Sequence, residues 1–156
     1  GRVGVIGTAA TMRSGAYEKY LHKKDGTLRL FTQACPLFVP LVENGRVHRG
    51  DIVIETVTRE YLAPLKDAGV DTLILGCTHY PLLEEVIADF MGPDVTLIDS
   101  GAEAANLAST QFDPNDGPGG TRYYVSDDPE GFDGLAGLFL QENVETRAEL
   151  IDISKF

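Results

Sequence analysis

The sequence predicts an α/β protein built on a mainly parallel sheet flanked by helices. Strand-like and helix-like stretches alternate along its 156 residues, which is the pattern of repeated βαβ units. Three of the strand-like stretches end in polar turns that contain glycine, namely Gly7-Thr8, Gly76-Cys77-Thr78 and Asp99-Ser100-Gly101. Because parallel strands end at one edge of a sheet and ligands bind beyond that edge, we expect these turns to lie near one another.

The expected strands are short apolar runs bounded by glycine, proline or aspartate. The first ends at Gly7, and the second is stopped by Pro36, since proline cannot donate to a sheet ladder. In chain order the expected strands cover residues 3–6, 28–32, 71–75, 95–98 and 122–125. The apolar alternation at 150–153 indicates a further short strand.

The expected helices place apolar side chains three and four residues apart. In chain order they cover about residues 11–23, 51–68, 82–91, 99–111 and 132–141. The longest is closed by Gly69. Its apolar face consists of Ile52, Ile54, Val57, Tyr61, Leu62 and Leu65. Residues 37–45 are predicted as a loop or a short helix.

A stretch rich in proline, glycine and aspartate, DPNDGPGG at 113–120, is the clearest boundary in the chain and is predicted as a linker loop. Residues 1–112 then form an α/β domain that carries Cys77, and residues 121–156 form a C-terminal strand–helix segment. The loop lacks the lysine of a phosphate-binding loop and follows no strand, so we predict no phosphate site there.

Charge and cysteine content exclude several classes of function. The formal net charge of −11, with no basic stripe, argues against a nucleic-acid partner. No apolar run is long enough to span a bilayer and no secretory signal is visible, so we expect a cytoplasmic protein without a membrane partner. Cys35 and Cys77 do not make a disulfide framework, and the CxxC and HxxxH spacings of zinc sites are missing.

Cys77 is the strongest candidate for a reactive residue. It follows a strand and Gly76, and the helix expected after it offers backbone N–H groups and partial positive charge that favour the thiolate. His79, two residues on, adds a proton carrier that works near neutral pH. Thr78 is expected to cap the helix, to contact a ligand, or to do both. The alternative for Cys77 is a small buried side chain, the usual fate of a free cysteine.

The remaining candidates have ordinary structural roles open to them. Thr8 and Thr11 lie three residues apart at a strand–helix junction and are expected to cap the helix, although two hydroxyls there also suit a carboxylate ligand. Glu43 follows an apolar run and, by itself, is expected at the surface. Cys35 has no basic neighbour and is expected to be structural. Asp99 and Ser100 are expected to form an ordinary helix cap.

Four sequence blocks, taken in order, carry a family resemblance. They are VGVIGTAATMRSGAY at 3–17, ACPLFVPLVENG at 34–45, DTLILGCTHYPLL at 71–83 and TLIDSGAEAA at 96–105. Together they resemble the glutamate racemase family of cofactor-independent amino-acid racemases, and GCTHYP is highly specific in this context. The weaker block TRYYVSDDPEGF at 121–132 is also in keeping with the family, so the resemblance covers nearly the whole chain.

The resemblance implies an Asp/Glu racemase-like fold and a reaction. Members of the family interconvert L- and D-glutamate without pyridoxal phosphate or metal, and supply D-glutamate for bacterial peptidoglycan. Two cysteines face opposite sides of the α-carbon; one removes the proton as a thiolate and the other returns a proton to the opposite face. By resemblance, Cys77 is the second of these cysteines.

The resemblance also implies roles for other residues. Thr8, Thr11 and Thr78 match positions whose hydroxyls hold or contact the substrate. His79 matches a residue that assists proton transfer and contacts the substrate, and Glu43 matches a catalytic-site carboxylate.

One part of the family pattern is missing from this sequence. Members begin with another α/β segment that carries the first catalytic cysteine in a Cys-Asn-Thr motif, which Cys35 does not match. The resemblance therefore predicts a second domain followed by a C-terminal segment, 121–156, that returns to complete a first, largely absent domain. The absent N-terminal segment is then a needed structural partner, and a homodimer is left open. With one of the two cysteines, we expect the chain alone to be at most feebly active.

Three other functions compete with this interpretation. One is a racemase that acts on aspartate or a related amino acid. Another is a catalytically inactive module that binds an acidic amino acid or a partner protein. The third is a cysteine hydrolase that uses Cys77 and His79.

Overall fold

The computed structural model describes residues 1–112, 120–140 and 147–155. The chain divides into two compact units, Gly1–Gln111 and Phe112–Phe156. Apart from Gly120, the predicted linker at 113–120 lies outside the described residues.

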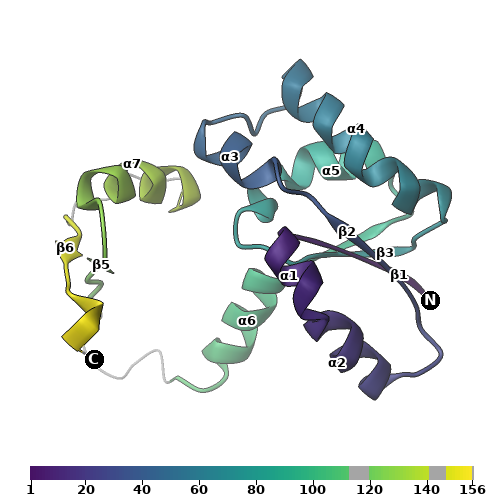
Figure 1. Cartoon of the computed structure of the whole chain (residues 1–156), viewed down its shortest axis with the longest axis horizontal. Coiled ribbons are helices and arrows are strands. Elements are labelled where there is room, and N and C mark those ends of the chain that lie inside the picture. The colour runs from purple at the N-terminus through teal and green to yellow at the C-terminus, as the bar shows by residue number, and fades with distance from the viewer. Residues whose placement is uncertain (113–119, 141–146, 156) are drawn as a thin grey trace. The chain divides into compact units, whose positions relative to one another are not determined.

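A four-stranded parallel sheet forms the centre of the first unit (Figure 1). Its strands are β1 (Arg2–Gly7), β2 (Arg29–Ala34), β3 (Thr72–Leu75) and β4 (Thr96–Asp99). Their order is β2-β1-β3-β4, so β1 and β3 are central. The predicted parallel sheet flanked by helices is confirmed. The central strands are apolar along most of their length because helices cover both faces of the sheet.

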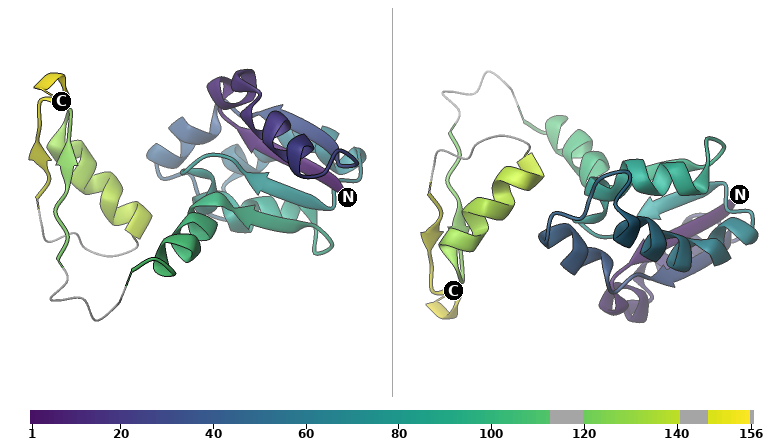
Figure 2. Two further views of the ribbon diagram at one scale, coloured as in Figure 1. Left: turned by 90° about the horizontal axis from the view of Figure 1, so that it is seen from below. Right: turned by 90° about the horizontal axis from the view of Figure 1, so that it is seen from above.

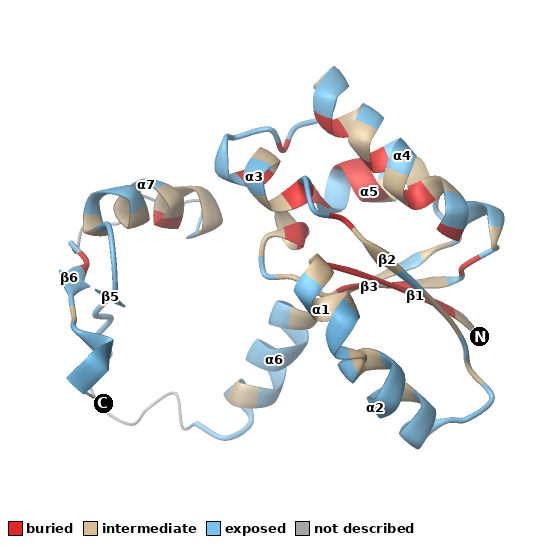
Figure 3. Ribbon diagram, viewed as in Figure 1, coloured by how far each residue is buried: buried red, intermediate tan, exposed pale blue. Residues whose placement is uncertain are grey.

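Helices cover the two faces of this sheet (Figures 1 and 2). One face carries α1 (Ala9–Ser14), α2 (Ala16–Lys24) and α6 (Ser100–Ser109). The other carries α3 (Phe38–Glu43), α4 (Ile52–Asp67) and α5 (Glu84–Met91). The arrangement is a doubly wound one, which buries the middle of the sheet (Figure 3).

Several completely buried side chains of the core lie on the central strands β1 and β3. Val5, Ile6, Leu73 and Leu75 have no exposed surface. Burial of each such side chain contributes about 1.5–3 kcal/mol relative to leaving it in water. The two central strands are therefore the most firmly held part of this unit.

Two predicted helices differ from the structure. The helix expected over 11–23 is broken at Gly15, whose φ of 60° lies in the left-handed region, so α1 ends there and α2 begins. The helix expected over 82–91 starts instead as a 3₁₀ turn, η1 (Tyr80–Leu83), and the α-helical part begins only at Glu84.

The long helix α4 is close to its predicted bounds. Asp51 caps its start by accepting a hydrogen bond from the Val53 N–H at 2.9 Å. The predicted apolar face is wrong at Ile52, which is 72% exposed, whereas Thr58 is completely buried on the same helix. The face therefore begins at Ile54, half a turn later than the apolar pattern indicates.

The second unit contains two short strands, β5 (Tyr124–Val125) and β6 (Glu149–Leu150), which pair in parallel. It also contains α7 (Pro129–Leu140) and a 3₁₀ turn, η2 (Ile153–Lys155). The strand predicted over 122–125 is thus shorter than expected, the one predicted over 150–153 ends at Leu150, and the helix predicted from residue 132 starts earlier. In the described parts of the chain, no helix has the length and apolar character needed to cross a membrane.

Candidate active site

The polar turns after β1 and β3 lie side by side at the carboxyl edge of the sheet. Ile6 pairs with Leu75 in the sheet, and the Gly76 N–H donates a hydrogen bond to the Ile6 carbonyl oxygen at 2.8 Å. The chain leaves β1 toward β2 on one side and leaves β3 toward β4 on the other. Doubly wound proteins bind their ligands at such a reversal, in the crevice beyond the strand ends.

Gly76 is required by how closely the two turns approach each other. A Cβ atom at this position would lie 2.7 Å from the Ile6 carbonyl oxygen and 3.2 Å from the hydroxyl oxygen of Tyr17. The first of these neighbours is backbone within a central strand and cannot move without disturbing the sheet. The residue before Cys77 therefore sets the position of the thiol.

Cys77 lies in the bend that follows β3, as a free and partly exposed thiol. Its carbonyl oxygen accepts a hydrogen bond from the Tyr80 N–H at 3.1 Å, which closes the turn. The 3₁₀ turn η1 lies between Cys77 and α5, so the α-helix begins at Glu84, two residues later than predicted.

The turn that carries Cys77 is anchored in the core by Tyr80. The Tyr80 ring is completely buried and packs edge-on against Phe38, with ring centroids 5.2 Å apart. Its hydroxyl donates a hydrogen bond to the Cys35 carbonyl oxygen at 3.0 Å, and burial raises its pKa. A neutral, hydrogen-bonded tyrosine therefore holds the turn to the loop after β2.

His79 bridges two of the predicted site residues. Its Nε2 atom lies 3.2 Å from Glu43 Oε1, and its Nδ1 atom lies 3.2 Å from Thr78 Oγ1. The His79 side chain is 21% exposed and that of Glu43 is 43% exposed, so the pair borders on solvent. The structure brings Glu43, the last residue of α3, to His79 across 36 positions of sequence. A carboxylate on one ring nitrogen fixes the orientation of the imidazole.

Thr8 and Thr11 lie at the end of β1 and make a helix cap, as expected from the sequence. The Thr11 N–H donates to Thr8 Oγ1 at 3.2 Å, and the two hydroxyl oxygens are 3.0 Å apart. Both side chains are only partly buried. The hydroxyls therefore keep hydrogen-bonding capacity on the side that faces solvent.

Ser100 is a residue whose role the sequence does not reveal. The sequence predicts both Asp99 and Ser100 as the helix cap, and it is Asp99 whose Oδ1 atom accepts a hydrogen bond from the Gly101 N–H at 2.7 Å. The neighbouring Ser100 hydroxyl donates to the Leu75 carbonyl oxygen at 2.9 Å. It thereby ties β4 and α6 to the last residue of β3, two positions before Cys77. A serine beside a cap residue gives no sequence signal for such a contact.

Cys35 differs sharply from Cys77. It has no exposed surface, and its backbone N–H donates to the Gly7 carbonyl oxygen at 2.9 Å. Burial raises the pKa of its thiol from 9.0 to about 12. Since folding raises this pKa, the stability that the protonated thiol contributes is complete below about pH 9 and declines as the pH rises toward 12.

The contrast between the two thiols predicts selective alkylation. Iodoacetamide at about pH 8 should modify Cys77 in the folded chain and leave Cys35 unmodified, because only an accessible thiolate reacts. Peptide mass spectrometry after brief treatment measures both sites, and the denatured chain, in which both should react, is the control. Equal labelling of the two cysteines in the folded chain would contradict this assignment.

Among the described residues, no group of three or more histidine, cysteine, aspartate or glutamate side chains is placed to hold a metal ion. The chemistry available at this edge of the sheet is that of a thiol, an imidazole–carboxylate pair and several hydroxyls. These groups are suited to moving a proton and to binding carboxylates.

Known proteins resemble this chain in sequence. The sequence profile of the Asp/Glu/Hydantoin racemase family matches residues 1–108. The glutamate racemase of Geobacter metallireducens is 44% identical over 146 residues, which are 90% of this chain and 53% of that protein. The glutamate racemase of a Carnobacterium species is 50% identical over 112 residues, 72% of this chain and 41% of that protein.

Solved structures show the same fold. Glutamate racemase from Francisella tularensis, determined in complex with D-glutamate, matches 99% of this chain and 59% of its own with a TM-score of 0.80 and 33% identity. Glutamate racemase from Thermus thermophilus, in complex with beta-chloro-D-alanine, matches 100% of this chain and 58% of its own with a TM-score of 0.77 and 39% identity.

The chain spans about half the length of the curated relatives that it matches, 53% and 41% for the two named above. The family match nevertheless includes β1 to β4 and every residue of the candidate site. The chain belongs to the Asp/Glu/Hydantoin racemase family.

Proposed function

We propose that this chain supplies one of the two proton-transferring faces of a glutamate racemase, with Cys77 as the acid–base group. The observation that carries the proposal is the position of Cys77, a partly exposed residue in the turn after β3, two residues before His79, which pairs with Glu43. The names of the relatives and the D-glutamate in the Francisella structure support glutamate as the substrate.

The proposed step is a proton transfer. The Cys77 thiolate takes the α-proton, so that an S–H bond forms and the C–H bond breaks. The electron pair stays on the α-carbon and spreads into the adjacent carboxylate. In the reverse direction the Cys77 thiol returns its proton to the same face. A thiol suits both directions because its two protonation states are accessible near neutral pH.

The surrounding hydroxyls and the imidazole fit the rest of this chemistry. We propose that Thr8, Thr11 and Thr78 hold the polar groups of the substrate by hydrogen bonds. His79, oriented by Glu43, then exchanges a proton with the substrate's amino group or with the thiol. Fixed donors of this kind stabilise the negative charge that develops as the α-proton leaves.

Inversion of the α-carbon requires a second proton carrier on the opposite face. Cys35 does not fit this role because it is fully buried and its pKa is raised to about 12. We therefore propose that the second cysteine comes from a further α/β segment, which residues 121–156 would help to complete. The product in this proposal is D-glutamate for peptidoglycan, made in the cytoplasm.

Incubation in deuterated water tests this function. The chain is mixed separately with L-glutamate, D-glutamate, L-aspartate and D-aspartate, and mass spectrometry follows deuterium at the α-carbon. We expect deuterium to enter one glutamate enantiomer with little inversion, because one face carries a base. No exchange with any of the four amino acids would refute the proposal, and so would rapid, complete racemisation by the chain alone.

The contact between His79 and Glu43 predicts the effect of a substitution at Glu43. Glu43→Gln should slow α-proton exchange about tenfold, because a hydrogen bond to a charged partner contributes about 1.5–3 kcal/mol and about 1.4 kcal/mol is a factor of ten in rate. The measurement is the initial rate of deuterium uptake. Glu60→Gln, at an exposed position of α4, is the matched control and should leave the rate unchanged. Equal rates for both variants would show that Glu43 has no part in the reaction.

A further inference from the structure

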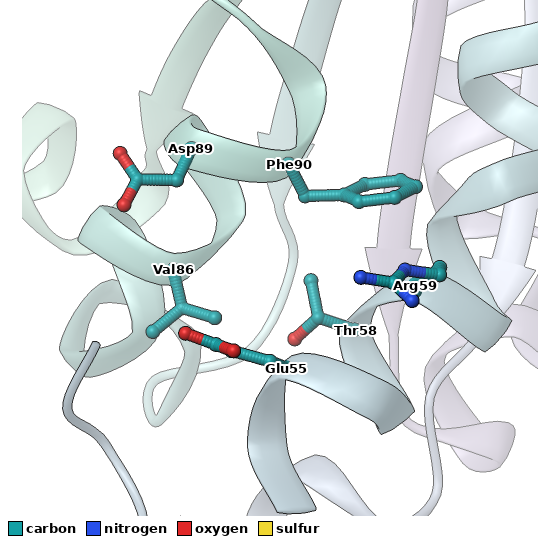
Figure 4. A pocket seen from close by; sticks show the side chains of 6 residues that line it. All are labelled: Glu55, Thr58, Arg59, Val86, Asp89 and Phe90. Carbon is teal, nitrogen blue, oxygen red and sulfur yellow. The ribbon is translucent and has the colours of Figure 1, made fainter. Parts of the chain in front are cut away.

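A cavity lies between α4 and α5, formed by residues outside the Cys77 site (Figure 4). Its volume is about 190 Å³. The side chains that line it are Glu55, Thr58, Arg59, Val86, Asp89 and Phe90.

Thr58 gives this cavity an unusual polar feature. The residue is completely buried, and its Oγ1 atom has no hydrogen-bond partner among the described residues. A threonine within a helix commonly donates to the carbonyl oxygen one turn earlier, but Thr58 does not. A buried hydroxyl without a partner costs free energy, so a bound molecule that supplies a partner, once the Thr58 side chain turns toward the cavity, would be stabilised here.

The size of the cavity argues for more than an ordered water. One water needs about 10–15 Å³ of such space. The cavity of about 190 Å³ is therefore large enough for a small organic molecule.

Opposite charges lie at different sides of the cavity (Figure 4). The Glu55 and Asp89 carboxylates are on one side and the Arg59 guanidinium is on the other, with Thr58 between them. Glu55 and Arg59 are one helical turn apart, a spacing that permits an ion pair, yet the carboxylate of Glu55 accepts instead from the Gly50 N–H at 2.7 Å.

The negative side is held in place by its own contacts. Arg49 donates from Nε and Nη2 to the two oxygens of Asp89, at 2.7 and 2.9 Å. Among the described residues Arg59 makes no ion pair, so its charge is available to a ligand. Val86 and Phe90 supply an apolar wall.

We propose that this cavity binds a zwitterionic α-amino acid with a small apolar side chain. Its ammonium group would lie near Glu55 and Asp89 and bond to the Thr58 hydroxyl, and its carboxylate would pair with Arg59. Its side chain would pack on Val86 and Phe90. An anion without an ammonium group is disfavoured by the two carboxylates. The site is separate from the Cys77 crevice and does not depend on the chemistry proposed there.

Calorimetric titration of the whole chain with L-valine tests the proposal. We expect saturable binding that weakens about tenfold in Arg59→Gln, because a charge-assisted contact is lost. Isobutylamine, which lacks the carboxylate, should bind more weakly than L-valine and be insensitive to this substitution. Arg29→Gln, at an exposed position of β2, is the control and should bind L-valine like the unmodified chain.

Two further variants distinguish binding in this cavity from binding in the Cys77 crevice. Thr58→Val should weaken L-valine binding without lowering the melting temperature, because it removes an unpartnered hydroxyl. Cys77→Ser should bind L-valine unchanged. The proposal is overturned if L-valine does not bind, if binding survives Arg59→Gln, if binding is lost in Cys77→Ser, or if Thr58→Val lowers the melting temperature.

Discussion

Replacement of Cys77 by serine is expected to slow α-proton exchange by about a hundredfold to ten-thousandfold, because a positioned general base contributes about 10²–10⁴ in rate and a hydroxyl is a far weaker acid than a thiol. Serine is close to cysteine in size and Cys77 is only partly buried, so the fold should be retained. The measurement is deuterium uptake at the α-carbon of glutamate, with the melting temperature of each variant as a check on folding.

The control for this result is Cys35→Ala. Cys35 is buried beneath the site and its thiol has a pKa of about 12, so its removal should affect stability more than exchange. If Cys35→Ala abolishes exchange in a folded chain while Cys77→Ser retains it, the roles assigned to the two cysteines are reversed.

Gly76→Ala is expected to have the second largest effect. The added Cβ would lie 2.7 Å from the Ile6 carbonyl oxygen, so β1 or the Cys77 turn must shift. Strain of this kind typically costs about 1–3 kcal/mol, and for a chain of this length each kcal/mol lowers the melting temperature by about 2–4 °C. Exchange should fall as well, because the thiol moves with the turn.

Gly26→Ala is the matched control for this substitution. The nearest atom to a Cβ at Gly26 is the His22 carbonyl oxygen at 3.9 Å, an ordinary contact. Its melting temperature should equal that of the unmodified chain or exceed it slightly. If the two alanine variants melt and exchange alike, the close approach at Gly76 does not set the position of Cys77.

The sheet and the location of the candidate site are largely predictable from the sequence. β1 and β3 are short apolar runs that stop at Gly7 and Gly76. A nearly continuous apolar run is the pattern of a strand that is covered by helices on both faces of a sheet. Parallel pairing then brings the residues after them to one edge. The neighbourhood of Thr8 and Cys77 follows from that geometry alone.

The remaining features depend on contacts that local patterns do not encode. The spacing of the apolar residues predicts one continuous helix over 11–23. Gly15 interrupts this helix, because glycine adopts the left-handed conformation at little cost. The pairing of Glu43 with His79 joins α3 to the turn after β3 and has no signal in either segment. Likewise Thr58 looks like an ordinary polar position of α4, and only the packing of α5 against it shows that its hydroxyl is buried.

A crystal structure of the chain with bound D-glutamate would test the role of Cys77 most directly. We expect the Cys77 sulfur atom to lie about 3–3.5 Å from the α-carbon, the separation at which a proton can be transferred, with His79 and the threonine hydroxyls around the amino acid. Glutamate bound in the crevice with its α-carbon turned away from this sulfur, or bound elsewhere on the chain, would contradict it.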